Sequence, residues 1–124
     1  MHEFGIVQNI LEKSLTVSKD AGAERIVSIT VELGEMVEAV EDSLQFAFGI
    51  LSEGTIAEGA ELVVETIAPR SHCADCGRDF EHDRYHLRCP HCESLSTQLL
   101  AGREMNIRSI DIDVPEDEEN QDGR

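Results

Sequence analysis

The chain has 124 residues, a formal net charge of −16, only 4% aromatic residues and no tryptophan. This length suffices for one ordinary domain, or for a small domain plus a module held together by a metal ion. The negative charge argues against anionic partners, so we expect it to bind neither nucleic acid nor a membrane surface. No apolar run is long enough to span a bilayer.

The first expected element is an N-terminal helix. Apolar residues recur at three- and four-residue steps between residues 4 and 15, which is typical of an amphipathic helix. We expect it to run from about residue 3 to residue 21, with Gly22 as its C-terminal stop. Its unpaired N–H groups and the positive end of its dipole then lie beside Met1 and His2.

Strands and a second helix follow. Residues 25–33 alternate as a half-buried strand does, with an apolar face of Val27, Ile29, Val31 and Leu33. Residues 35–40 are irregular, and residues 43–52 have the pattern of a second core-facing helix. Its apolar face holds Leu44, Ala47, Phe48 and Leu51, and is widened by Phe46 and Ile50. A loop at 55–59 leads to a β-rich run at 60–67.

All four cysteines lie in two Cys-x-x-Cys pairs, Cys73–Cys76 and Cys89–Cys92, separated by twelve residues. This spacing predicts structural zinc, because four thiolates about 2.3 Å from the ion complete a tetrahedral shell and leave no open position for catalysis. Gly77 supplies the permissive backbone that the first turn needs. Glu93 does not, so the second pair is expected to turn by other means. A hairpin carrying Phe80 and Tyr85 would span the connector.

Other readings of the cysteines and of the nearby histidines stay open. Two disulfides would suit a secreted chain, but no apolar signal segment precedes the first helix, so we expect a reducing cytoplasm. A thioredoxin-like redox site would need one Cys-x-x-Cys pair beside a βαβ unit, whereas this segment holds two such pairs. Four histidines flank or occupy the segment: His72, His82, His86 and His91. They are either solvated, or His72 or His91 competes with a cysteine when protonation changes.

The last strand begins after Gly102. Its apolar positions change from odd numbers, at 105 and 107, to even numbers, at 110, 112 and 114. Either a bulge near Ser109 keeps both halves facing the core, or the strand is buried on both sides. We therefore predict an α+β fold, with two helices packed on a small mixed sheet of about three strands and an inserted zinc-ribbon-like module. Residues 115–124 form an acidic tail that we expect to be disordered.

His2 is the other candidate metal ligand. Its imidazole, its own deprotonated amide nitrogen and the terminal amine of Met1 can chelate one ion, and the Glu3 amide nitrogen or a carboxylate can add a fourth ligand. Planar nitrogen coordination suits Ni(II) or Cu(II). In the tripeptide alone, an incidental histidine is the commoner explanation.

Several motifs in one order resemble the HypA/HybF family of hydrogenase nickel-incorporation proteins over residues 1 to about 114. They are Met-His-Glu-Phe at the terminus, Leu33-Gly34-Glu35, Asp42-Ser43-Leu44-x-Phe46-Ala47-Phe48, the two Cys-x-x-Cys pairs and Gly102-x-Glu104-Met105-x-Ile107-x-x-Ile110. The resemblance implies a metallochaperone rather than an enzyme. It would deliver Ni(II) as cargo during maturation of [NiFe]-hydrogenase and, in some organisms, of urease.

The resemblance also implies a division of the chain and its site residues. Residues 1–68 and 102–114 would form a nickel-binding α/β domain, and residues 69–101 a zinc domain. His2 carries over as the nickel ligand, beside the terminal amine of Met1 and the backbone of Glu3. The zinc ligands would be Cys73, Cys76, Cys89 and Cys92.

The implied partners are a maturation GTPase of the hydrogenase pathway and the hydrogenase large subunit precursor. Glu41 and Asp42 are candidates for a carboxylate near the nickel, and pairing into a homodimer stays open. Three rival functions remain: a zinc-ribbon protein-interaction adaptor, a nucleic-acid module and a small hydrolase. The negative net charge argues against the nucleic-acid module. Four cysteine ligands would leave zinc without the open coordination position that a hydrolase needs.

Overall fold

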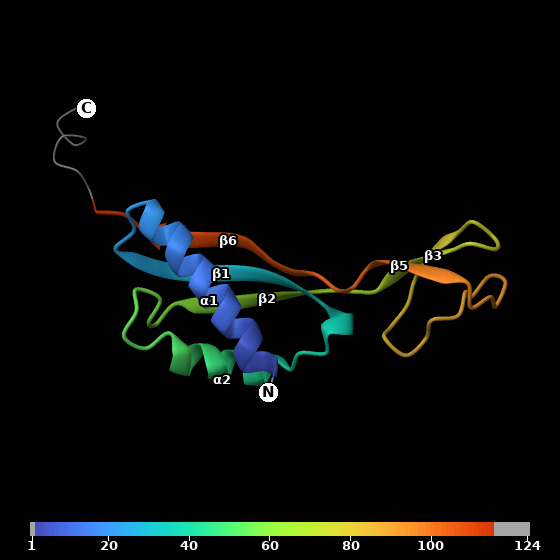
Figure 1. Ribbon diagram of the computed structural model, residues 1–124, viewed down its shortest axis with the longest axis horizontal. Coiled ribbons are helices and arrows are strands. Elements are labelled where there is room, and N and C mark those ends of the chain that lie inside the picture. The colour runs from blue at the N-terminus through green and yellow to red at the C-terminus, as the bar shows by residue number, and fades with distance from the viewer. Residues whose placement is uncertain (1, 116–124) are drawn as a thin grey trace, which may run out of the picture. The chain divides into compact units, whose positions relative to one another are not determined.

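The computed structural model describes residues 2–115, and Figure 1 shows its elements. In chain order they are α1 (His2–Asp20), β1 (Arg25–Gly34), the 3-10 helix η1 (Glu35–Val37), α2 (Glu41–Leu51), β2 (Glu61–Ile67), β3 (Arg70–Cys73), β4 (Asp79–Glu81), β5 (Thr97–Ala101) and β6 (Met105–Asp113). The α+β prediction is confirmed. None of the described helices is both long and apolar enough to cross a membrane. The predicted disordered tail lies outside the described residues except for Pro115.

The strands form two sheets. The first has the order β2-β1-β6, so its third strand comes from beyond the cysteine segment, as predicted. The second, β4-β3-β5, is built within the cysteine segment and was not predicted. Its pairs are antiparallel, and Ser71 lies opposite Phe80 on one side and Leu99 on the other. The predicted hairpin carrying both Phe80 and Tyr85 is wrong, because Phe80 lies in β4 whereas Tyr85 lies in an exposed turn.

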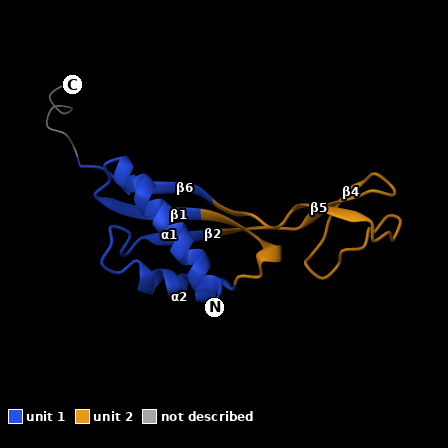
Figure 2. Cartoon of the chain, viewed as in Figure 1, with its two compact units in different colours: residues 1–30, 40–63, 107–124 blue, residues 31–39, 64–106 orange. Residues whose placement is uncertain are grey.

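The chain divides into two compact units, coloured separately in Figure 2. Unit 1 comprises residues 1–30, 40–63 and 107–124, and unit 2 comprises residues 31–39 and 64–106. The division falls within β1, β2 and β6. The boundaries expected at residues 68/69 and 101/102 both lie inside unit 2, and the domain division proposed from the resemblance stays a prediction.

Helix α1 buries one face against the rest of unit 1. Its buried residues are Ile6, Val7, Ile10, Leu11, Ser14 and Ser18. The helix ends in two hydrogen bonds, from the Gly22 N–H to the Lys19 carbonyl (3.0 Å) and from the Ala23 N–H to the Ser18 carbonyl (2.9 Å). Gly22 has a φ of +78°, the left-handed conformation that this type of helix end requires. The predicted stop at Gly22 is confirmed.

Two predicted apolar faces need correction. Phe46 and Ile50 are 65% and 44% exposed, so they do not widen the buried face of α2. At 100° per residue they lie on the opposite side of the helix from Leu44 and Phe48, which are buried. In β1, Val27 is exposed and Ile26 is buried in its place. The Ile26 N–H donates to the carbonyl of Ile56, which brings the segment after α2 against this end of the strand.

Strand β6 is not buried on both faces. Ile107, Ile110 and Ile112 are half-buried, while Arg108, Ser109 and Asp111 are exposed. The alternative of a strand buried on both sides is therefore wrong. The three-residue step from Ile107 to Ile110 is what a bulge near Ser109 would produce, and the bulge itself stays a prediction.

Candidate metal centres

The four cysteines converge in unit 2. Their Sγ atoms all lie within 4.8 Å of one another, a spacing that could hold a metal ion. Sγ of Cys73 lies 3.5 Å from that of Cys92, and Sγ of Cys76 lies 3.6 Å from that of Cys89. Zinc bonds of about 2.3 Å in a tetrahedron would place the sulfur atoms about 3.8 Å apart. The thiols thus need only small shifts to enclose zinc.

Two matching turns present the thiols. The Gly77 N–H donates to the Cys73 carbonyl at 2.9 Å, and the Glu93 N–H donates to the Cys89 carbonyl at 2.8 Å. Gly77 has a φ of +77° and Glu93 a φ of +64°. The expectation that the second turn would differ is wrong: Glu93 adopts the same left-handed conformation, although its Cβ makes that conformation costly. Cys73 and Cys89 also form a buried cluster with Phe80.

The surroundings of the thiols shift their pKa values in opposite directions. Burial raises the pKa of Cys89, but the N–H groups of Cys92 and His91 outweigh it and lower the pKa to about 7. The Ser94 N–H lowers the pKa of Cys92, but the neighbouring Cys73 sulfur and burial outweigh it and raise the pKa to about 12. Four adjacent thiolates repel one another, so a cation is needed to hold all of them deprotonated.

The alternative of disulfides is not supported. All four cysteines are free, and the Sγ–Sγ distances of 3.5 Å and 3.6 Å are far longer than the bond of about 2.05 Å in a disulfide. The neighbouring histidines are held by other groups. His72 Nδ1 lies 2.6 Å from an Asp79 carboxylate oxygen, and His91 Nδ1 lies 3.1 Å from the Arg78 guanidinium. Competition between a histidine and a cysteine for the metal stays a prediction.

The N-terminal candidates lie at the start of α1. Met1 is outside the described residues, so its amine has no described position. The His2 side chain is 55% exposed, and its Nε2 lies 3.8 Å from Oε2 of Glu3, whose own side chain is only 13% exposed. That oxygen also accepts a hydrogen bond of 3.3 Å from the Val40 N–H. Bonds from its own backbone N–H and from that of Val40 lower the pKa of Glu3.

Sequence reasoning missed the contact with Val40. The donor is a backbone group, so no side-chain pattern marks it. Glu41 and Asp42, the candidate carboxylates for nickel, directly follow Val40 as the first two residues of α2. The contact therefore brings the start of α2 to the start of α1, within unit 1.

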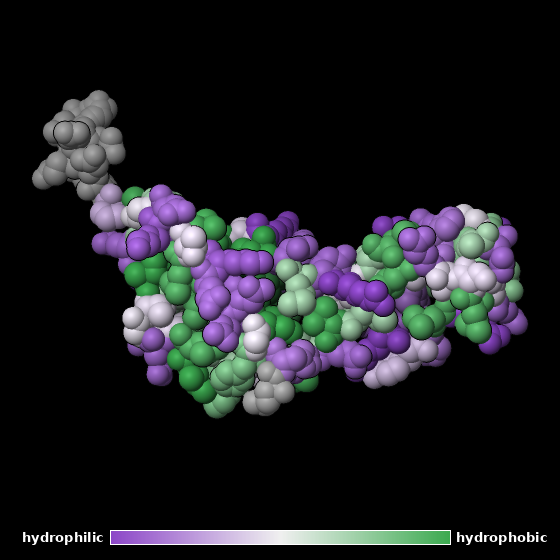
Figure 3. All heavy atoms as spheres, in the orientation of Figure 1, coloured by the Kyte–Doolittle hydropathy of each residue, from purple (hydrophilic) through white to green (hydrophobic). Residues whose placement is uncertain are grey.

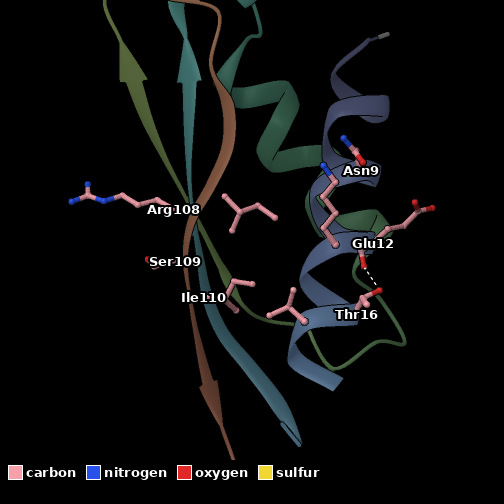
Figure 4. A pocket seen from close by; sticks show the side chains of 9 residues that line it. Asn9, Glu12, Thr16, Arg108, Ser109 and Ile110 are labelled. Carbon is pink, nitrogen blue, oxygen red and sulfur yellow. Dashed lines mark hydrogen bonds between the residues drawn. The ribbon is translucent and has the colours of Figure 1, made fainter. Parts of the chain in front are cut away.

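A groove of about 800 Å³ opens between α1 and β6. In Figure 4, Ile110 points toward α1 whereas Arg108 points away from it, and a hydrogen bond joins Thr16 to the Glu12 carbonyl at the helix surface. The groove contains no cysteine or histidine. Apolar residues also reach the surface on the face drawn in Figure 3. The groove offers no nucleophile paired with a base, so it gives no support to the hydrolase alternative.

Comparison with known proteins identifies the family. The sequence matches the family described as "Hydrogenase/urease nickel incorporation, metallochaperone, hypA" over residues 1–112. The chain belongs to the HypA family.

Relatives of this HypA-family chain are similar along nearly their whole length. A hydrogenase maturation factor HypA of Aquifex aeolicus is 34% identical over 114 residues, which cover 92% of this chain and 99% of that protein. A hydrogenase maturation factor HypA of Geobacter metallireducens is 31% identical, over 91% of this chain and all of the relative.

A solved structure shares the fold. The solution structure of the Ni metallochaperone HypA from Helicobacter pylori matches with a TM-score of 0.67 and 21% identity, over 93% of this chain and all of that chain. A second solution structure of a HypA protein matches with a TM-score of 0.68 and 23% identity, over 90% of this chain and 96% of that chain. At these identities the structural similarity supports the fold alone. The assignment to the HypA family rests on the family match and on the motifs.

Proposed function

We propose that this chain binds Ni(II) at Met1, His2 and Glu3 and delivers it during maturation of [NiFe]-hydrogenase or urease. The observation that supports this most strongly is the family match over residues 1–112, which begins with the Met-His-Glu terminus. The amine of Met1, the amide nitrogen of His2 and its imidazole would form fused chelate rings. The backbone nitrogen of Glu3 or a carboxylate would add the fourth ligand, in the planar geometry that Ni(II) favours.

The carboxylate has nearby candidates in the fold. Glu41 and Asp42 begin α2, next to the Val40 N–H that the Glu3 side chain contacts. Either residue is therefore a candidate for the carboxylate that completes the nickel shell. Acidification would release the ion, because protons compete with the metal for the amine and the imidazole.

In this proposal the cysteine cluster is a structural metal site. Zinc bound by Cys73, Cys76, Cys89 and Cys92 would have no open coordination position, so it would not catalyse a reaction. Accordingly, we take the protein to be a carrier and not an enzyme. Its partners would be a maturation GTPase and the hydrogenase large subunit precursor, in the cytoplasm, with neither nucleic acid nor a membrane involved.

Calorimetric titration of Ni(II) into zinc-loaded, untagged protein tests the proposal. The comparison uses His2→Ala, a variant with one extra N-terminal residue, and His86→Ala as a control histidine whose side chain is 78% exposed. We expect near-stoichiometric binding that the first two changes abolish and the control preserves, with zinc content unchanged. Binding that survives in both terminal variants would contradict the terminal chelate and favour the adaptor alternative.

A further inference from the structure

The Glu3 side chain is partly buried in unit 1. It is only 13% exposed, although carboxylates lose hydration free energy on burial and are normally exposed. Oε2 accepts the hydrogen bond from the Val40 N–H at 3.3 Å. Val40 is the residue that precedes α2, and its own side chain makes no capping hydrogen bond. The carboxylate thus supplies an acceptor and a negative charge to the start of α2, where N–H groups are unpaired.

The same carboxylate oxygen lies near His2. Its distance from His2 Nε2 is 3.8 Å. A chelate ring closed through the His2 amide nitrogen and its imidazole uses Nδ1, which leaves Nε2 to donate its proton elsewhere. Metal-bound histidines usually donate this second N–H to a carboxylate or carbonyl, which fixes the ring and strengthens it as a ligand. A modest rotation of the exposed His2 ring would bring Nε2 within hydrogen-bond distance of Glu3.

We infer that the Glu3 carboxylate is a positioning residue for nickel binding, which holds the first turn of α1 to Val40 and orients the His2 imidazole. This inference rests on the proposed nickel chelate and gives the side chain of Glu3 a role separate from that of its backbone nitrogen. The role requires a hydrogen-bond acceptor at this place and not a metal–oxygen bond. Glutamine, which keeps one acceptor oxygen, therefore replaces glutamate with little loss, whereas alanine does not.

The test measures nickel affinity of zinc-loaded protein by competition with a chelator. We expect Glu3→Ala to weaken binding about tenfold or more, the usual effect of losing a group that orients a ligand. Glu3→Gln stays close to the unchanged protein. Val40→Pro removes the donor at a position whose φ of −90° and ψ of 124° are close to what proline adopts, and whose side chain is exposed. Val40→Ala keeps the N–H and serves as its matched control.

Two further comparisons test whether Glu3 acts through its contact with Val40. The double variant of Glu3→Ala with Val40→Pro should bind no more weakly than Glu3→Ala alone, because both changes remove the same contact. In NMR spectra, Glu3→Ala should shift the Val40 amide signal even without nickel, and this readout does not depend on the proline variant.

Two results would overturn the inference. One is wild-type affinity in Glu3→Ala, and the other is Glu3→Gln binding as weakly as Glu3→Ala, which would make the carboxylate a direct ligand. His2→Ala distinguishes these failures from failure of the proposed function. If His2→Ala abolishes binding while Glu3→Ala leaves it unchanged, only the positioning role fails. If neither change alters binding, the terminal chelate itself is wrong.

Discussion

Gly34 and Gly102 pack backbone against backbone, so that a side chain on Gly34 would overlap the Gly102 carbonyl. Hydrogen bonds on both sides fix this contact. The Gly34 N–H donates to the Glu104 carbonyl and the Met36 N–H donates to the Gly102 carbonyl, each at 2.8 Å. The segments around Gly34 and Gly102, both in unit 2, are therefore held together at a place where only glycine fits.

Substitution of Gly34 by alanine should destabilise the protein severely. The added Cβ forces the two backbones apart and breaks both hydrogen bonds, at a cost of more than about 3 kcal/mol. Gly5→Ala is the matched control, because a Cβ at this position in α1 meets nothing within 4 Å. It should stabilise the fold by about 0.5–1 kcal/mol. Urea unfolding measures both, and similar midpoints for the two variants would contradict the close approach.

Substitutions at the left-handed residues of the two cysteine turns, Glu93 and Gly77, should change the stability in opposite directions. Glu93→Gly should stabilise the metal-bound protein by about 1 kcal/mol, because glycine adopts a positive φ without steric cost. Gly77→Ala should destabilise it by a similar amount, although a Cβ at Gly77 meets no atom within 4 Å. Thermal unfolding of zinc-loaded variants gives the comparison. A destabilising Glu93→Gly change would mean that the Glu93 side chain makes a compensating contact.

Helix α1 carries two buried hydroxyl groups, those of Ser14 and Ser18, for which the structure gives no hydrogen-bond partner. A buried hydroxyl without a partner costs about 1–3 kcal/mol. Ser14→Ala should therefore raise the free energy of unfolding by about 1 kcal/mol, helped by the higher helix propensity of alanine. Thr16→Ala is a control on the same helix, because the Thr16 hydroxyl donates to the Glu12 carbonyl. If Ser14→Ala proves destabilising in chemical denaturation, the hydroxyl has a partner such as water.

Removal of the metal should selectively unfold the cysteine module, residues 70–101. Binding of structural zinc supplies about 10–16 kcal/mol of folding free energy in small zinc modules, which exceeds what three short strands provide. A strong chelator, or Cys89→Ser, should abolish hydrogen-exchange protection of the β3 and β5 amides while α1 amides stay protected. Protection of β3 that survives chelation would show that the sheet folds without metal.

Asp83 makes the loop between the cysteine pairs sensitive to acid. Its Oδ1 accepts hydrogen bonds from the N–H groups of Tyr85 (2.8 Å) and His86 (2.9 Å), and His86 Nδ1 lies 2.6 Å away. The His86 side chain is the largest cause that holds the pKa of Asp83 below its ordinary value of 3.8. Because its pKa is lowered in the folded protein, the Asp83 carboxylate stabilises the folded loop at pH values above the ordinary pKa. This stabilisation is lost as the pH falls through the lowered pKa.

Amide exchange of Tyr85 and His86 at neutral pH measures this contribution. Asp83→Ala should speed exchange at both amides, because it removes the acceptor. Asp79→Ala is the control, because it removes a nearby carboxylate whose described bonds go to Arg70 and His72. Equal effects of the two changes would contradict a specific role for Asp83.

Much of the architecture could be predicted from periodicity and spacing. The helix stop at Gly22, the central strand β1 and the convergence of the cysteines each follow from a local pattern with one physical cause. The misplaced residues are those whose surroundings come from elsewhere in the chain. Phe46 and Ile50 are apolar, but no other described element covers their side of α2.

The candidate nickel site shows the same limit. His2 and Glu3 could be selected from the motif, because the proposed chelate would use adjacent residues. The hydrogen bond to Val40 could not, because it joins residues 37 positions apart through a backbone donor. Likewise, Glu93 adopts a left-handed conformation because the second cysteine turn repeats the geometry of the first, although its residue type argues against it.

The buried cluster of the cysteine module has a consequence for the lifetime of the protein. Two of its three members, Cys73 and Cys89, are thiols, and only Phe80 is a hydrocarbon. If the cysteines hold zinc as proposed, a chain made in a zinc-starved cell would expose residues 70–101 to proteases, since the small buried cluster and three short strands would not hold that segment folded by themselves. Its abundance would then follow the supply of zinc, although its proposed cargo is nickel.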